Sequence, residues 1–293
     1  MENLNYKILN SVSQHKSLKP KLKILFKDCY GHDLDDDLYK QYYILSPFGE
    51  TISLVALNHK NNLVGHYALL PMLAVNKEYE EIKYYLGITL AIRKEYSSLG
   101  ILPKLFSLAK KIMSEKKIDL ILGFPNKNSF LLLKTFYNWD IVYESPFFSF
   151  SNSLFKNNEK IKLSIKENFP LFNQFSPPYN NKEYFKWRSI RSKIEIYNIN
   201  DKLTIIGKFH KGNYFDVLDL HEFGETDYKL IGGFLTEIGA DGINITELHA
   251  KKIGLVIPIN YERKDIVRMG LMSLNNTITN NKFRFSLMFS DVY

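Results

Sequence analysis

The stretch that decides the fold is Tyr85 to Met113, YLGITLAIRKEYSSLGILPKLFSLAKKIM, which predicts a buried strand, a short polar turn and an amphipathic helix. In the strand, large apolar and mostly small side chains alternate with the period of two of a β-strand: Leu86, Ile88, Leu90 and Ile92 on one face, Tyr85, Gly87, Thr89 and Ala91 on the other. In the helix, apolar side chains recur every three or four residues and indicate one core-facing side: Leu102, Leu105, Phe106, Ala109, Ile112 and Met113. We expect the small face of the strand to admit a ligand.

The turn between this strand and helix is a candidate phosphate site. It reads Ser97-Ser98-Leu99-Gly100-Ile101-Leu102. The first turn of a helix presents backbone N–H groups without intrahelical partners, together with the positive end of the helix dipole. Small residues there let the backbone wrap an anion, and a pyrophosphate is the expected guest. The alternative is that Gly100 only permits a tight turn and the serines cap a structural helix.

A second motif follows the helix, in the stretch Lys117 to Asp140, KIDLILGFPNKNSFLLLKTFYNWD. It predicts a hydrophobic strand at Leu120 to Leu122, a break at Gly123 to Asn128, and a short helix that ends near Trp139.

In this order of elements the chain resembles the GNAT superfamily of acyl-CoA-dependent N-acyltransferases. In that family a strand bends into a Gln/Arg-x-x-Gly-x-Gly/Ala turn that holds the coenzyme A pyrophosphate. Here the turn keeps Gly100 but has Ser97 and Leu102 at the flanking motif positions. The phrase Gly-Phe-Pro-Asn at 123–126, with a serine and an Asn-Trp pair after it, is similar to the ending of GNAT enzymes that acylate sugars. The resemblance covers roughly residues 22–150.

The resemblance implies acyl-CoA as co-substrate, no metal, and a set of cofactor-binding residues. Backbone groups at the splayed end of the central strand would steady the oxyanion, and two Asn side chains would hold the pantetheine arm or a water. The implied residues are Ala91, Ile92, Ser97, Ser98, Leu99, Gly100, Ile101, Leu102, Asn126 and Asn128. The alternative for Asn126, which follows a proline, is ordinary turn chemistry.

The general base predicted from the sequence is His66, in Val64-Gly65-His66-Tyr67-Ala68, because a strand next to the cleft carries it and imidazole titrates in the useful range. The alternative is a structural, hydrogen-bonded histidine. Many GNAT enzymes have a Tyr general acid on the helix after the Asn motif, and Lys134 occupies that position here. Direct attack of the amine, without a dedicated acid, is therefore expected.

The acceptor is predicted from aromatic and basic residues near strand ends, Tyr84, Tyr85, Trp187 and Arg188. Rings could stack on a sugar or nucleobase, and the guanidinium could meet a diphosphate; the alternatives are core packing and a surface ion pair. The nearest likeness is to GNAT enzymes that acylate a nucleotide-linked amino sugar, such as a dTDP-3-amino-3,6-dideoxyhexose, for O-antigen or capsule synthesis. The acyl group would be acetyl or a small hydroxyacyl.

The whole chain predicts an α/β fold with a mixed central sheet flanked by helices, arranged as two GNAT-like halves in tandem. Residues 1–150 would form the acyltransferase domain, with a hairpin at Ile52 to Leu70, and residues 151–293 a second GNAT-like domain. In the second half, strands are expected between residues 194 and 220, then a helix near Asp227 to Ile238, a strand at Ile243 to Leu248 and a short helix near Lys264 to Ser273. This half has no phosphate turn, so it would bind acceptor or stabilise a homodimer.

Composition agrees with a cytoplasmic enzyme. The chain has 293 residues, 45% of them hydrophobic, which is enough for sizeable cores. The single cysteine, Cys29, excludes an intrachain disulfide and is consistent with a reducing compartment. No leader or apolar run of membrane-spanning length is visible, so no membrane insertion is expected. The net charge of +8 is spread along the chain without a nucleic-acid-binding motif, and no nucleic-acid partner is expected.

Two other classes of function stay open. One is a GNAT transferase that acts on a protein, peptide or aminoacyl substrate, including the two-half peptidoglycan bridge enzymes; these usually carry a long helical arm, and no such insertion is visible. The other is a catalytically silent GNAT-like binding module, which Ser97 and Leu102 would allow.

Overall fold

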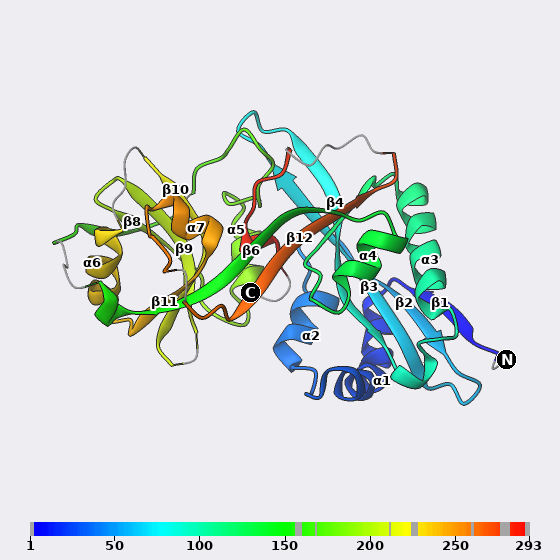
Figure 1. Cartoon of the computed structure of the whole chain (residues 1–293). Coiled ribbons are helices and arrows are strands. Elements are labelled where there is room, and N and C mark those ends of the chain that lie inside the picture. The colour runs from blue at the N-terminus through cyan, green and yellow to red at the C-terminus, as the bar shows by residue number, and fades with distance from the viewer. Residues whose placement is uncertain are drawn as a thin grey trace.

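The computed structural model describes residues 3–155, 160–167, 169–210, 212–223, 228–258, 261–275 and 282–290. Its strands form one 12-stranded sheet in the order β1-β2-β3-β4-β5-β12-β6-β11-β10-β9-β8-β7 (Figure 1). Most neighbours are antiparallel, whereas β4–β5 and β10–β11 are parallel. Helices cover both faces of the sheet, so the expected α/β fold with a mixed central sheet is confirmed.

The first half contains the predicted meander, turn and helices. Its strands are β1 (Asn5–Leu9), β2 (Ile52–Leu57), β3 (Leu63–Val75), β4 (Glu81–Ile92), β5 (Leu120–Gly123) and β6 (Asp140–Ser151). Its helices are α1 (Val12–Tyr30), α2 (Asp36–Tyr43), α3 (Ile101–Lys116) and α4 (Phe130–Phe136), with the 3₁₀ turn η1 (Lys94–Tyr96) before α3. β2 and β3 form the predicted antiparallel hairpin. α1 and α2 pack on one face of the sheet, and α3 and α4 on the other.

The second half repeats the order of meander, helix and strand. Its strands are β7 (Leu163–Lys166), β8 (Glu195–Ile199), β9 (Leu203–His210), β10 (Tyr214–Glu222) and β11 (Gly242–Thr246). Its helices are α5 (Lys182–Arg188), α6 (Lys229–Glu237) and α7 (Glu247–Lys252); the 3₁₀ turn η2 (Asn152–Leu154) follows β6, and the 3₁₀ turn η4 (Leu287–Phe289) is the last described element. The predicted helix near Asp227 to Ile238 is α6, although Asp227 itself lies outside the described residues.

The segment predicted as a helix near Lys264 to Ser273 is instead a strand, β12 (Asp265–Ser273). β12 lies between β5 and β6, where Gly270 is opposite Gly123 and Val267 opposite Ser145. Most of its side chains are buried because both faces of the sheet are covered there. In a short apolar run that is buried on both faces, the spacing of apolar residues does not distinguish a strand from a helix. This explains why the segment was predicted as a helix.

Two strands connect the halves of the sheet. β6 pairs with β12 along its first part and with β11 along its last, so it runs through both halves (Figure 1). β12 comes from the carboxy-terminal part of the chain but completes the sheet of the first half. The division into two GNAT-like domains at residue 150 therefore remains a proposal. In it, β6 of the first domain extends into the sheet of the second, and β12 of the second domain completes the sheet of the first.

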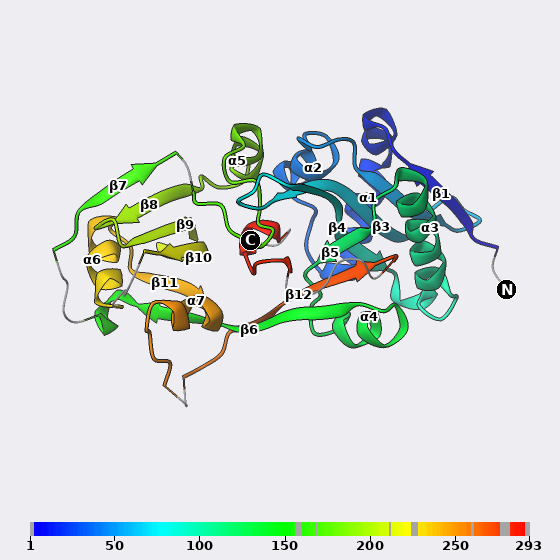
Figure 2. The same ribbon diagram turned by 90° about the horizontal axis from the view of Figure 1, so that it is seen from above.

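The carboxy-terminal segment fills the space between the two halves, where Figure 2 shows it in red beside α5. Phe283, Leu287 and Phe289 are fully buried there. The same segment carries Arg284, whose guanidinium donates hydrogen bonds to the carboxylate of Asp219 and to the Leu220 carbonyl on β10. Asp219 is fully buried and also accepts hydrogen bonds from the Tyr179 hydroxyl and the Leu220 N–H. This ion pair fastens the segment to the second half.

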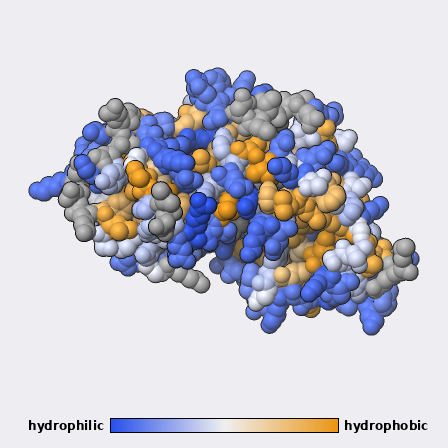
Figure 3. Space-filling view, in the orientation of Figure 1, coloured by the Kyte–Doolittle hydropathy of each residue, from blue (hydrophilic) through white to orange (hydrophobic). Residues whose placement is uncertain are grey.

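The surface seen in Figure 3 is polar over most of its area, with hydrophobic side chains gathered over and beside α4. Leu131 and Phe136 on that helix are 61% and 73% exposed. Within the described residues, every helix is too short or too polar to cross a bilayer.

Candidate active site

The candidate site is a cavity of about 450 Å³ that opens where β4 and β5 diverge. These strands pair in parallel only at Tyr85–Ile121 and Leu86–Leu122. Beyond these pairs, residues 87–90 of β4 and 123–126 at the end of β5 line the cavity. Gly87 stands at the fork, where a Cβ would come within 2.3 Å of the Tyr67 hydroxyl. A side chain at residue 87 would therefore displace its neighbours at the fork.

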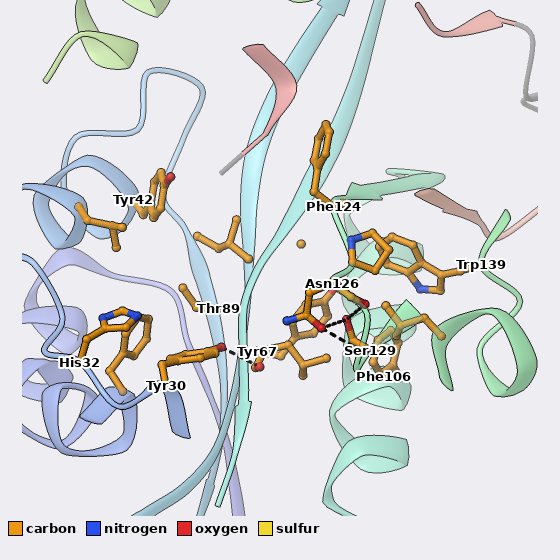
Figure 4. A pocket seen from close by; sticks show the side chains of 18 of the residues that line it. Tyr30, His32, Tyr42, Tyr67, Thr89, Phe106, Phe124, Asn126, Ser129 and Trp139 are labelled. Carbon is orange, nitrogen blue, oxygen red and sulfur yellow. Dashed lines mark hydrogen bonds between the residues drawn. The ribbon is translucent and has the colours of Figure 1, made fainter. Parts of the chain in front are cut away.

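Side chains from both faces of the sheet line this one cavity (Figure 4). The face covered by α1 and α2 contributes Phe26, Tyr30, His32, Leu38 and Tyr42. The face covered by α3 and α4 contributes Tyr67, Phe106, Ser129, Leu133 and Trp139. The cavity therefore passes through the gap between the strands, and two ligands can meet in it from opposite sides of the sheet.

The wall of the cavity contains a β-bulge in β4. His66 on β3 is opposite Ala91, and Ala68 is opposite Ile88, so Thr89 and Leu90 together face a single residue of β3. Thr89 has φ +52°, in the left-handed region. Thr89 and Leu90 both line the cavity, whereas Ala91 and Ile92 do not. The irregular backbone thus lies two residues before the positions predicted from the sequence.

The bulge also reverses the alternation of β4. Leu86, Ile88 and Ala91 share one core cluster, while Leu90 and Ile92 pack on the cluster under α3. The expectation that Leu86 and Leu90 point to the same face is wrong, because an extra residue in the strand changes the phase of every side chain after it.

The predicted phosphate turn is an exposed bend at the start of α3. Gly100 is its N-cap residue with φ +69°, and no side chain caps the helix. The Ser97 hydroxyl donates to the Lys94 carbonyl at 2.8 Å, so this serine does not serve as a cap. Residues 97–100 are exposed, and only Ile101 is fully buried. The bend before α3 is thus exposed to solvent, although residues 97–102 do not themselves line the cavity.

His66 lies behind the cavity wall and not in it. Its side chain is fully buried, with Nδ1 2.9 Å from the Thr89 carbonyl oxygen and Nε2 3.2 Å from Ser53 Oγ. Burial lowers the pKa of His66 to about 4. His66, predicted as the general base, is thus not among the residues that line the cavity, whereas Thr89, to which it is hydrogen bonded, is.

The comparisons with known proteins are structural only, since no protein-family model and no curated protein matches the chain. A GCN5-related N-acetyltransferase from Kribbella flavida superposes with a TM-score of 0.65 at 9% identity, over 93% of this chain and 72% of its own. One from Anabaena variabilis gives 0.58 at 13% identity, over 91% and 72%. A GCN5-related glucosamine N-acetyltransferase region of a fungal β-N-acetylglucosaminidase gives 0.59 at 13%, over 93% and 38%. The chain has the GNAT fold.

Of the two asparagines expected to serve the coenzyme in this GNAT fold, one lines the cavity. Asn126 does so, but its Oδ1 accepts the backbone N–H groups of Asn128 and Ser129 at 3.0 and 3.1 Å. These hydrogen bonds are the turn chemistry considered as the alternative. Asn128 is exposed and lies outside the cavity lining.

The four residues predicted to contact the acceptor are buried and lie outside the cavity lining. Tyr84 packs edge-on against Phe283 and Phe289, and Tyr85 is buried under α3. Trp187 donates its Nε1–H to the Gln41 carbonyl at 2.6 Å, and Arg188 donates to the Ser290 carbonyl at 2.9 Å. Tyr84, Trp187 and Arg188 are buried because the two halves and the carboxy-terminal segment pack around them, which residue spacing alone does not show.

Sequence reasoning missed the residues that line the cavity from the side of α1 and α2. Tyr30 donates its hydroxyl to the Leu90 carbonyl at 2.9 Å, and His32 stacks on the Tyr30 ring with centroids 5.9 Å apart (Figure 4). The usable signal was Gly31, which ends α1 in the left-handed conformation and turns His32 back beside Tyr30. Arg191, in the connection between α5 and β8, also lines the cavity. No local pattern relates it to β4.

Proposed function

We propose that this protein is an acyl-CoA-dependent N-acyltransferase that acylates the amine of a nucleotide-linked amino sugar, such as a dTDP-3-amino-3,6-dideoxyhexose. The acyl group is acetyl or a small hydroxyacyl, and the product enters O-antigen or capsule synthesis in the cytoplasm. The observation that carries the proposal is the cavity through the gap between β4 and β5. Its volume of about 450 Å³ is in the range of small-molecule sites.

The geometry supports direct transfer between two bound molecules. The thioester enters from the side of α3 and α4, and the amine from the side of α1 and α2. The amine nitrogen attacks the carbonyl carbon, a C–N bond forms, the C–S bond breaks, and the amine proton leaves as the thiolate is protonated. The lining is mostly apolar and contains no carboxylate among the described residues, which favours the neutral amine.

The coenzyme is proposed to bind across the amino end of α3. Its diphosphate would contact the free N–H groups that follow Gly100, and the pantetheine arm would run past Thr89 and Asn126 into the cavity. No group of three His, Cys, Asp or Glu side chains in the described chain could hold a metal ion. The groups proposed to bind the coenzyme are backbone N–H donors and side-chain amides.

The acceptor side has one cationic side chain suited to a phosphorylated amine. Among the described lining residues, Arg191 is the only lysine or arginine. It takes the role expected of Arg188, which is buried. An amino-sugar acceptor is also in keeping with the glucosamine N-acetyltransferase region reported above. Because Arg191 belongs to residues 151–293, the second half contributes to acceptor binding in this proposal.

Replacing Arg191 with Met is expected to raise the KM for a nucleotide-linked amino sugar at least tenfold, because a charge-assisted hydrogen bond to phosphate contributes about 1.5–3 kcal/mol. The coenzyme KM should stay within about twofold. Steady-state kinetics with both substrates varied measure the two constants. Arg263→Met is the control, since Arg263 is exposed and outside the cavity. Equal effects of both substitutions, or a change in the coenzyme KM alone, would contradict the assignment.

The proposed function is tested by free-thiol release from acetyl-CoA and longer acyl-CoAs against a panel of amines. We expect turnover with nucleotide-linked amino sugars, and much slower turnover with the same sugars lacking the nucleotide. Turnover confined to peptide or aminoacyl amines would replace the acceptor class. Coenzyme A binding without thiol release on any amine would identify a silent module and overturn the proposal.

A further inference from the structure

The bulge at Thr89 is a strained element that other residues must hold. A β-branched residue in the left-handed region is uncommon, and the conformation costs about 1–2 kcal/mol. Such strain persists only where the surrounding structure determines it. In this chain the strain occurs at φ +52° in the cavity wall, where the backbone of β4 leaves its regular pairing.

Two buried side chains fasten Thr89 from the side away from α3. Tyr43 on α2 hydrogen bonds to Thr89 Oγ1 at 2.7 Å, and His66 Nδ1 lies 2.9 Å from the Thr89 carbonyl oxygen. His66 Nδ1 is also 3.2 Å from Thr89 Oγ1. The hydroxyl and the carbonyl of Thr89 thus both have partners from neighbouring elements.

The direction of the hydrogen bonds follows from what each atom can do. A carbonyl oxygen only accepts, so His66 Nδ1 carries the proton and donates it to Thr89. His66 Nε2 is then the acceptor, and the Ser53 hydroxyl donates to it across 3.2 Å. Ser53 Oγ in turn accepts from His15 Nε2 at 3.1 Å. The chain of hydrogen bonds from His15 to Thr89 therefore has one consistent orientation.

We infer that His66 is a positioning residue that clamps the Thr89 bulge, and that it does not accept the proton of the substrate amine. Its one basic nitrogen points away from the cavity toward Ser53, and its other nitrogen donates to the wall itself. The clamp fixes the backbone of residues 89 and 90, past which both substrates lie. This inference rests on the proposed function, since it assigns a role in that reaction.

The surroundings keep the clamp in one protonation state. The titratable groups that face His66 are His15 from α1 and Tyr43 from α2. Burial lowers the pKa of both histidines, that of His66 to about 4, although Glu50 acts on His15 in the opposite direction. With a pKa of about 4, His66 gains no proton between pH 6 and 9, so we expect the clamp to add no ionisation step to the pH–rate profile in that range.

The test compares His66→Asn with His66→Leu. Asn can still donate an amide N–H to the Thr89 carbonyl, whereas Leu fills the space without a donor. We expect kcat/KM to stay within about fivefold in the Asn variant and to fall at least thirtyfold in the Leu variant, since a buried acceptor left unpaired costs about 1–3 kcal/mol. The shape of the pH profile should be the same in wild type and His66→Asn. His210→Leu, at a half-exposed histidine of the second half, is the control.

A second measurement reports on the clamp without activity. In spectra of the ¹⁵N-histidine-labelled protein, His66 should be in the Nδ1–H tautomer from pH 6 to 9. Either of two results would overturn the inference and make His66 the general base. One is an Nε2–H tautomer; the other is a His66→Asn variant that is as inactive as His66→Leu and has lost the acid limb of its pH–rate profile. Absence of acyl transfer by the wild type would instead overturn the proposed function. The tautomer of His66 would still show whether His66 donates its hydrogen bond to Thr89.

Discussion

Replacing Asp219 with Asn is expected to lower the free energy of unfolding by about 3–5 kcal/mol, because it leaves a buried guanidinium without its counter-charge. Asp219 is fully buried, and the Arg284 side chain is only 10% exposed. Asn keeps the size of the side chain but removes the charge, so Arg284 remains desolvated and uncompensated. Urea unfolding followed by circular dichroism measures the change, and the melting temperature should fall by roughly 10 °C.

The matched control for this change is Asp33→Asn. Asp33 pairs with Lys27 at 3.8 Å, and both side chains are more than two-thirds exposed, at 79% and 70%. An exposed ion pair contributes less than about 1 kcal/mol. Equal destabilisation by the two substitutions, or a loss below 1 kcal/mol for Asp219→Asn, would show that the Asp219–Arg284 pair does not fasten the carboxy-terminal segment.

The same pair predicts a dependence on pH. Burial acts to raise the pKa of Asp219, but its interactions with charged neighbours, Arg284 above all, outweigh burial and hold that pKa below its ordinary value. A lowered pKa contributes stability that is present above the ordinary value near 4 and is lost as the pH falls through the lowered one. The difference in unfolding free energy between wild type and Asp219→Asn should therefore shrink below about pH 4. Unfolding curves at pH 7 and pH 3 measure it.

Replacing Gly100 with Val is expected to raise the KM for acyl-CoA at least tenfold, with a much smaller effect on the acceptor KM. Gly100 has φ +69°, which a β-branched residue avoids, so the bend before α3 must change and its N–H groups turn away from the diphosphate. A Cβ at this position would meet no atom within 4 Å, so the cause is conformational and not steric. Initial rates with the coenzyme varied measure the effect.

Gly239 offers a closely matched control for Gly100. It also has φ +69° with no atom within 4 Å of a Cβ, and it lies after α6 in the second half. Gly239→Val should cost similar stability through the same backbone strain while the coenzyme KM stays unchanged. If both substitutions raise the KM equally, or neither does, the start of α3 does not hold the diphosphate.

The part of the fold that could be predicted is the part that local sequence determines. The helix stripe of α3 is confirmed, since Leu105, Phe106 and Ala109 are buried as expected. The hairpin of β2 and β3 is confirmed, because a short polar turn between two apolar stretches is also a local signal. The bend at Gly100 was also visible, because glycine ahead of an apolar helix repeat is a local signal.

What could not be predicted depends on contacts between distant segments. β12 reads as a short apolar run, and only its place between β5 and β6 makes it a strand. The bulge depends on the positive φ angle of Thr89, and a threonine within a strand sequence gives no signal for that angle. His66 and Trp187 looked available for chemistry because their burial comes from α1, α2 and the carboxy-terminal segment. Arg191 could not be assigned without the sheet that joins the halves.

The place of β12 also has a consequence for biosynthesis. β5 and β6 are separated by a full strand spacing that only residues 265–273 fill. While the ribosome is still adding the second half, the first half holds two unpaired strand edges in its centre, and its sheet can close only after residue 273 has left the exit tunnel. Folding of the site therefore waits until residue 273 has been made, and a nascent chain released before β12 is made keeps those edges exposed.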